Sequence, residues 1–143
     1  MKRFLYVVSF IIAFSMLFGC SSEVGKSEFI QSVSQEMVHL NDGTPKQAKE
    51  YFEKKITEEG DGGLHVFHQD GKSYLMLAEQ NRMISSVQEF TDHVRVVTTF
   101  SPSSSAGGTF NGENKIPPVL YITVIDKIEK PYGVFREEQI RLD

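Results

Sequence analysis

The chain has 143 residues, of which 40% are hydrophobic, and its 15 Lys and Arg residues are outnumbered by 19 Asp and Glu residues, which gives a net charge of −4 at pH 7. This length suits one globular domain, and the acidic balance argues against nucleic acid as a partner. Cys20 is the single cysteine, so the fold cannot rest on an internal disulfide and needs an apolar core.

The amino terminus has the pattern of a secretory signal. Lys2 and Arg3 precede an apolar run, residues 4–18, which is shorter than the roughly 20 residues of a membrane-spanning helix. The run closes on Leu17-Phe18-Gly19-Cys20, which resembles the lipobox of bacterial lipoproteins, although Phe18 is bulkier than the usual residue there. The resemblance implies diacylglycerol on the Cys20 thiol, cleavage before Cys20 and acylation of the new amino terminus. The alternative is an ordinary signal peptide or an uncleaved anchor with an incidental cysteine.

The lipoprotein interpretation divides the chain into a signal peptide at 1–19, a lipidated cysteine and tether at 20–26, and a single small globular domain at 27–143. Two or more acyl chains hold a protein stably on a bilayer, so no second membrane-binding element is required. Removal of residues 1–19 takes away two basic residues and no acid, which brings the net charge to about −6. We therefore expect a lipid-anchored protein on the extracytoplasmic face of a bacterial membrane.

Two helices are expected at the start of the domain. Ser27 can cap a helix over residues 28–40, with an apolar stripe at helical spacing: Phe29, Ile30, Val33, Met37 and Leu40. A strand with Ile30, Ser32 and Ser34 on one face is the alternative for this stretch. Thr44-Pro45 predicts the start of a second helix that ends near residue 59, with Ala48, Tyr51, Phe52 and Ile56 on its apolar side.

From Leu64 onward the hydrophobic pattern has a period of two, which predicts strands. Asp70-Gly71 marks a tight turn between the first two of them, and residues 74–78 are apolar on both faces, which predicts a central strand. A turn is expected at 130–133, followed by an edge strand over 134–142, with a late helix over 137–142 as the alternative. The predicted strands are residues 64–68, 73–78, 83–90, 94–100, 119–125 and 134–142. The fold class is therefore α+β: one or two N-terminal helices followed by a mainly antiparallel β-meander sheet or small sandwich.

No motif for a metal, a cofactor or catalysis stands out, and we expect none of the three. His65 and His68 are three residues apart, and on a strand they would point to opposite faces, so they could not share an ion. Asp92-His93 with Ser85 or Ser86 could suggest a nucleophile site, but the neighbouring Asp and His are expected to diverge. The acidic turn at 58–61 lacks the ligand spacing of a calcium loop.

The best candidate for an interaction segment is the Ser- and Gly-rich stretch 101–114, because long loops inside a compact domain are usually functional. Its lone aromatic residue, Phe110, is a candidate anchor for a partner, or it tucks back onto the sheet. Tyr132, beside the turn at 130–133, is the second candidate interaction residue.

Residues 44–126 resemble the C-terminal domain of the PrcB-like protease-complex family, small extracytoplasmic β-rich modules often found on lipoproteins. The matching features are the preceding helix, the hairpin at 66–77, Val94-Arg95-Val96 with Ser101-Pro102, and the strand at 116–122. Such domains usually carry a Thr-Gly-Gly-Tyr-like motif after the second strand, where this chain has Gln80-Asn81-Arg82-Met83. The resemblance implies a non-catalytic module that binds, stabilises or inhibits a protease or another envelope protein.

Together these patterns predict a lipid-anchored protein-interaction module whose partners are the membrane, through Cys20, and an envelope protein. The alternative is a small-ligand-binding or enzymatic lipoprotein with an unrecognised pocket.

Overall fold

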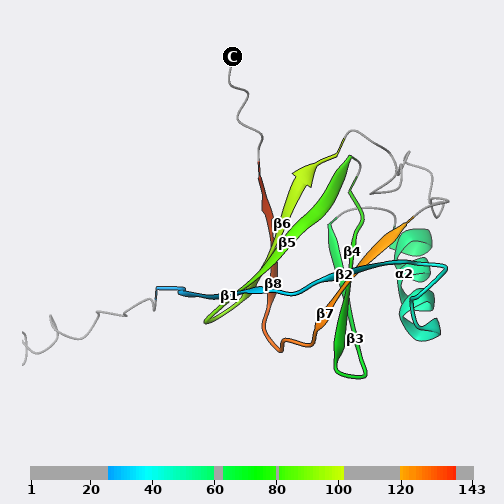
Figure 1. Ribbon diagram of the computed structural model, residues 1–143. Coiled ribbons are helices and arrows are strands. Elements are labelled where there is room, and N and C mark those ends of the chain that lie inside the picture. The colour runs from blue at the N-terminus through cyan, green and yellow to red at the C-terminus, as the bar shows by residue number, and fades with distance from the viewer. Residues whose placement is uncertain (1–25, 60–62, 80, 102–119, 138–143) are drawn as a thin grey trace, which may run out of the picture.

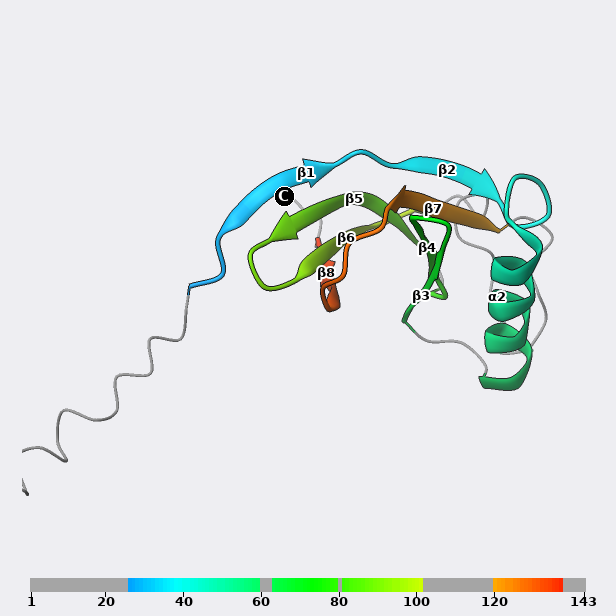
Figure 2. The same cartoon turned by 90° about the horizontal axis from the view of Figure 1, so that it is seen from below.

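The structure is a computed structural model that describes residues 26–59, 63–79, 81–101 and 120–137. Its strands form two four-stranded sheets, sheet A in the order β1-β5-β6-β8 and sheet B in the order β2-β7-β4-β3. Both views show the order sheet A, sheet B, helix (Figures 1 and 2). The elements are β1 (Phe29–Val33), β2 (Glu36–His39), α2 (Lys46–Glu59), β3 (Leu64–Gln69), β4 (Lys72–Leu77), β5 (Arg82–Phe90), β6 (Val94–Phe100), β7 (Tyr121–Asp126) and β8 (Tyr132–Arg136).

The helix α2 lies where Thr44-Pro45 and the apolar stripe predict it. Ala48, Phe52 and Ile56, each four residues apart, lie on one face of the helix and are fully buried. They pack against Tyr74 and Met76 of β4, so α2 covers the face of sheet B that is turned away from sheet A. The Thr44 hydroxyl donates to the His39 carbonyl oxygen at 2.9 Å, which ties the start of the helix to β2.

The helix predicted over residues 28–40 is wrong, and the strand alternative is correct. This stretch forms β1 and β2, which pair with β5 in sheet A and with β7 in sheet B. Figure 2 shows the two strands as one continuous path along the edges of both sheets. Pairing with distant strands overrides the local helical spacing, and Val33 packs into the core between the sheets.

The hairpin of β3 and β4 matches its prediction closely. Asp70 and Gly71 both have positive φ angles, 50° and 73°, as a two-residue turn of type I′ requires. The strand β4 is an interior strand of sheet B, and its side chains alternate between the two cores of the molecule. Met76 faces α2, whereas Leu75 and Leu77 face sheet A.

The sheets are mainly antiparallel, but their strands do not form a meander. The strand β7 pairs between β2 and β4, and β8 lies at the edge of sheet A, parallel to β6. An edge strand was predicted over residues 134–142, but β8 starts earlier, at Tyr132, within the stretch predicted as a turn. Residues 138–142 lie outside the described part of the chain.

The core between the sheets combines apolar packing with the hydrogen bonds of one buried serine. Leu75 of β4 and Ile125 of β7 meet Val87 of β5 and Val96 of β6. Among these apolar residues lies Ser73, which is fully buried. Its Oγ accepts a hydrogen bond from the Tyr132 hydroxyl at 3.1 Å and lies 2.8 Å from Nδ1 of His68, so the serine links sheet B to β8.

Candidate functional site

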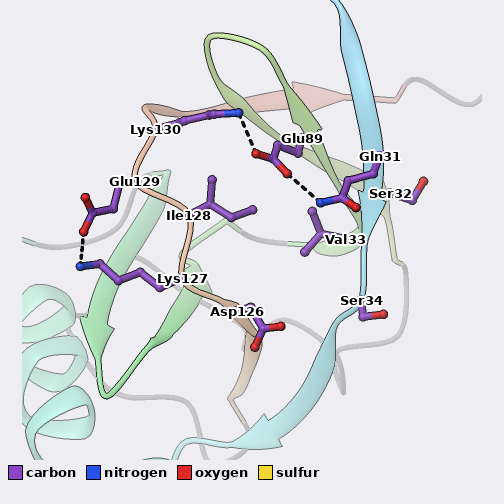
Figure 3. Close-up of a pocket in the computed structure, with 10 residues that line it drawn as sticks. All are labelled: Gln31, Ser32, Val33, Ser34, Glu89, Asp126, Lys127, Ile128, Glu129 and Lys130. Atoms are coloured by element: carbon purple, nitrogen blue, oxygen red, sulfur yellow. Dashed lines mark hydrogen bonds and ion pairs between the residues drawn. The ribbon is translucent and has the colours of Figure 1, made fainter.

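A polar cleft of about 570 Å³ opens at one end of the two sheets (Figure 3). It is lined by residues 31–34 of β1 and its continuation, by Glu89 of β5, and by residues 126–130 between β7 and β8. Val33 and Ile128 supply its apolar part, and both also pack against the core between the sheets. The cleft is therefore formed by strands on two sides and by the link between β7 and β8 on the third.

Four of the five charged side chains that line this cleft pair with one another, and the fifth, Asp126, pairs with Lys72. Nζ of Lys130 donates to Oε1 of Glu89 at 2.7 Å, and the Gln31 side chain donates to Oε2 of Glu89 at 2.8 Å. These two hydrogen bonds, with Lys130 the larger cause, hold the pKa of Glu89 below its usual range. Lys127 pairs with Glu129 in the same way at 2.5 Å. Glu89 is therefore ionised at neutral pH, and a general acid or base would need a pKa nearer to 7.

The outer face of sheet A is the second candidate, defined here as the face turned away from sheet B, which carries Phe29, Phe90, Arg95 and Phe135. Arg95 lies between Val94 and Val96, both fully buried in the core between the sheets, so its side chain points outward. Phe29 is 55% exposed and Phe135 is 50% exposed. Among the residues that the structure describes, no helix or strand packs on this face, in contrast to sheet B.

The guanidinium of Arg95 lies over two aromatic rings on this face. Its guanidinium carbon lies 4.2 Å from the ring centroid of Phe90 and 5.2 Å from that of Phe135. Phe90 in turn contacts Phe29 edge-on at 5.7 Å and stacks on His93 at 4.7 Å, with an interplanar angle of 8°. The outer face of sheet A thus carries a connected group of rings around one cation.

Asp92 and His93, which were expected to diverge, in fact contact each other. Nδ1 of His93 lies 2.8 Å from Oδ1 of Asp92, and the hydroxyl of Ser27 donates to the same oxygen at 2.5 Å. The Ser27 hydrogen bond first, and the His93 contact second, hold the pKa of Asp92 below its usual range. Ser27 and Asp92 both approach Nδ1 of His93, whereas a nucleophile triad uses the two ring nitrogens separately. The cluster therefore fastens Ser27 to the β5–β6 turn.

The two histidines of the suggested metal pair do lie on opposite faces, as their spacing on a strand predicts. In the β3–β4 register, His65 pairs with Met76, which faces α2, and His68 pairs with Ser73, which faces sheet A. Within the described ranges, no group of three or more His, Cys, Asp or Glu side chains has the arrangement of a metal site.

Three residues were predicted to carry function, Cys20, Phe110 and Tyr132, and the structure describes Tyr132 alone of these three. Tyr132 is half-buried, and its hydroxyl donates to the carbonyl oxygen of Ile128 and to Ser73, so it is part of the core between the sheets. Cys20 and Phe110 lie outside the described residues, as do the predicted signal peptide and residues 102–114.

Sequence reasoning missed Phe29, Arg95 and Phe135 as a group. For Phe29, the strand alternative for residues 28–40 could have indicated its position, because a strand there would place Phe29 on a sheet. The contact of Arg95 with the Phe135 ring depends on β6 and β8 lying side by side in parallel. No local pattern in the sequence encodes that arrangement.

Comparison with protein-family models, with curated proteins and with solved structures finds no match to this chain. The described part of the chain contains no helix that is long and apolar enough to cross a membrane.

Proposed function

We propose that this chain is a lipid-anchored extracytoplasmic module that binds an envelope protein through the outer face of sheet A. The observation that carries the proposal is the contrast in coverage between the sheets: α2 buries the far face of sheet B, while Phe29 and Phe135 stay half exposed on sheet A. Exposed aromatic residues grouped around an arginine are typical of the centres of protein interfaces.

The position of the anchor supports the same face. The strand β1 begins at Phe29, nine residues after Cys20, so a fully extended tether spans at most about 30 Å. The hydrogen bonds of Ser27 to Asp92 and of the Glu28 amide to Thr91 fix the point where the tether joins sheet A. A lipid on Cys20 would therefore hold sheet A close to the bilayer, within reach of other envelope proteins.

The resemblance to the PrcB-like family adds an envelope protease to the candidate partners. The alternative function, a small-ligand-binding or enzymatic lipoprotein, would use the cleft beside Glu89. The paired charges of that cleft count against it, because a ligand would have to break existing ion pairs to bind them.

Photocrosslinking in intact cells tests whether the outer face of sheet A binds a protein partner. A photoreactive amino acid replaces Phe135 on the outer face of sheet A or, as the matched control, Lys54 on α2, whose side chain is 69% exposed. We expect a discrete protein adduct from position 135 and none from position 54. The same adducts from both positions, or none from position 135, would contradict the proposal.

The anchor half is tested by metabolic labelling with an alkyne-tagged fatty acid. The full-length chain should incorporate the label, and the Cys20→Ala variant should lose it. A variant that is still labelled would show that the lipid, if any, lies elsewhere.

A further inference from the structure

The guanidinium of Arg95 has no anionic partner among the residues that the structure describes. Its contacts are the rings of Phe90 and Phe135, at 4.2 Å and 5.2 Å. By contrast, Lys130 pairs with Glu89 at 2.7 Å and Arg136 pairs with Glu79 at 2.7 Å. Rings cover the faces of a guanidinium but leave the donors at its edge available for hydrogen bonds. Within the described part of the chain, Arg95 is therefore a pre-positioned cation whose donors have no anionic partner.

The glycine beside Arg95 leaves open space on the same face. Gly133 of β8 is the cross-strand partner of Arg95, and a Cβ added to it would have no heavy atom within 4 Å. Glycine weakens a strand, and one in a strand interior often marks a place where a ligand or another backbone approaches closely. Here the open position lies on the strand beside Arg95, and Phe135, two residues further along β8, carries the half-exposed ring that contacts the guanidinium.

The outer edge of β8 pairs with no other strand that the structure describes. The amide of Val94 donates to the carbonyl of Pro131, and the amide of Glu137 donates to the carbonyl of Thr98, which mark the two ends of the β6–β8 ladder. In a parallel pair, alternate residues bond to the neighbouring strand. The backbone groups of Tyr132, Val134 and Arg136 therefore point away from β6, toward an edge where no described strand lies.

We propose that the partner presents an extended acidic segment that pairs with the free edge of β8 and places a carboxylate on Arg95, above Gly133. The inference rests on the proposed function and names the chemistry of the partner at the same face. A carboxylate matches the fork of donors that a guanidinium offers, and an added strand supplies backbone hydrogen bonds in register. A single cation that has no anionic partner in the described ranges calls for one anion at this position.

A lipid surface fits this face less well than a peptide does. Attraction to anionic lipid depends on clusters of basic residues, whereas this face presents one arginine on a chain of net charge −4. The same acidic balance would repel an anionic bilayer as a whole.

The test is a selection of displayed random eight-residue peptides on the purified full-length chain in detergent micelles. The chain and its variants Arg95→Gln, Arg95→Lys and Gly133→Val are compared, with thermal melting of each variant as the check on folding. The affinity of the best peptide is measured by fluorescence anisotropy, beside a version in which its acidic residues are replaced by their amides.

We expect the selected peptides to carry Asp or Glu among β-branched residues. Amide replacement should weaken binding at least tenfold to the original chain and leave binding to Arg95→Gln unchanged, because the two changes remove the same contact. Arg95→Lys should restore only part of the affinity. Gly133→Val should melt no lower than the original chain, yet lose at least tenfold in affinity.

Several results would overturn the inference. These are peptides without a preference for acids, equal losses in the presence and absence of Arg95, full affinity in the Gly133→Val variant, or no selected peptide at all. Binding to vesicles of phosphatidylglycerol and phosphatidylethanolamine that requires Arg95 would assign the face to lipid instead. If position 135 captures a protein in cells while any of these results holds, the proposed function stands and the acidic segment does not.

Discussion

The two sheets are built from similar strands, but they differ in the faces that they turn away from each other. In sheet B, β4 sends Met76 toward α2 and Leu75 toward sheet A, and both side chains are fully buried. In sheet A, β6 sends Val96 into the shared core and Arg95 outward, where the rings of Phe90 and Phe135 contact it. Sheet A, which no described element covers on this side, thus carries aromatic rings around a cation where sheet B carries buried apolar side chains. Within the described residues, no element covers this outer face, and it is the face that we propose binds a partner.

The contacts that close the ends of the two sheets differ in a similar way, apolar in sheet B and polar in sheet A. The end of sheet B next to α2 is closed by apolar packing of Leu40 and Leu120 against the helix. The end of sheet A nearest the tether is closed by polar contacts, those of Ser27 with Asp92 and of Lys130 with Glu89. Stability should therefore respond strongly to changes beneath α2 and weakly to changes on the outer face of sheet A.

The largest effect is expected from Phe52→Ala beneath α2. Phe52 is fully buried, and removal of a buried Phe ring leaves a cavity that costs about 3–5 kcal/mol. Urea unfolding followed by circular dichroism measures the loss of unfolding free energy. A loss below about 1 kcal/mol would contradict the packing of α2 on sheet B.

A smaller loss is expected from Ser73→Ala between the sheets. The change removes the acceptor for Tyr132 and the contact to His68, while the Tyr132 hydroxyl keeps the Ile128 carbonyl. We expect a loss of about 1–2 kcal/mol in the same unfolding measurement. Tyr132→Phe is the matched change at the partner residue, and the two effects should add only in part, because both variants lose the hydrogen bond between Tyr132 and Ser73.

Phe135→Ala on the outer face of sheet A should cost about 1 kcal/mol or less. The ring is half exposed, so its truncation forfeits little buried area and one contact with Arg95. Compared with Phe52→Ala, it removes the same side chain from the uncovered sheet. Equal losses from the two variants would refute the contrast between the sheets.

The smallest effect is expected from Glu89→Gln, and it should depend on pH. Because the pKa of Glu89 is lower in the folded state, its contribution is present above the ordinary pKa of Glu and is lost as the pH falls through the lowered value. The variant should therefore lose less stability than the original chain between pH 6 and pH 3. Melting temperatures over this range provide the measurement, and parallel curves for both chains would contradict it.

The sequence predicted the elements whose signals are local. Asp70-Gly71 located the turn of the β3–β4 hairpin, and the Ala48–Ile56 stripe located α2, since both depend on neighbouring residues. The stretch 28–40 was misjudged because its pairing partners, β5 and β7, lie far along the chain. The same limit applies to the site, because Arg95 meets Phe135 only through the parallel pairing of β8 with β6.

We propose that the outer face of sheet A serves binding and contributes little to the stability of the fold. The most direct test measures partner capture and melting together in one variant, Arg95→Gln, in the full-length chain that carries the photoreactive residue at position 135. We predict that capture is lost while the melting temperature stays within about 3 °C of the original, as expected for a change of under 1 kcal/mol in a domain of this size. Absence of capture even with Arg95 in place, or capture that falls only in proportion to the folded fraction, would contradict this role of the face.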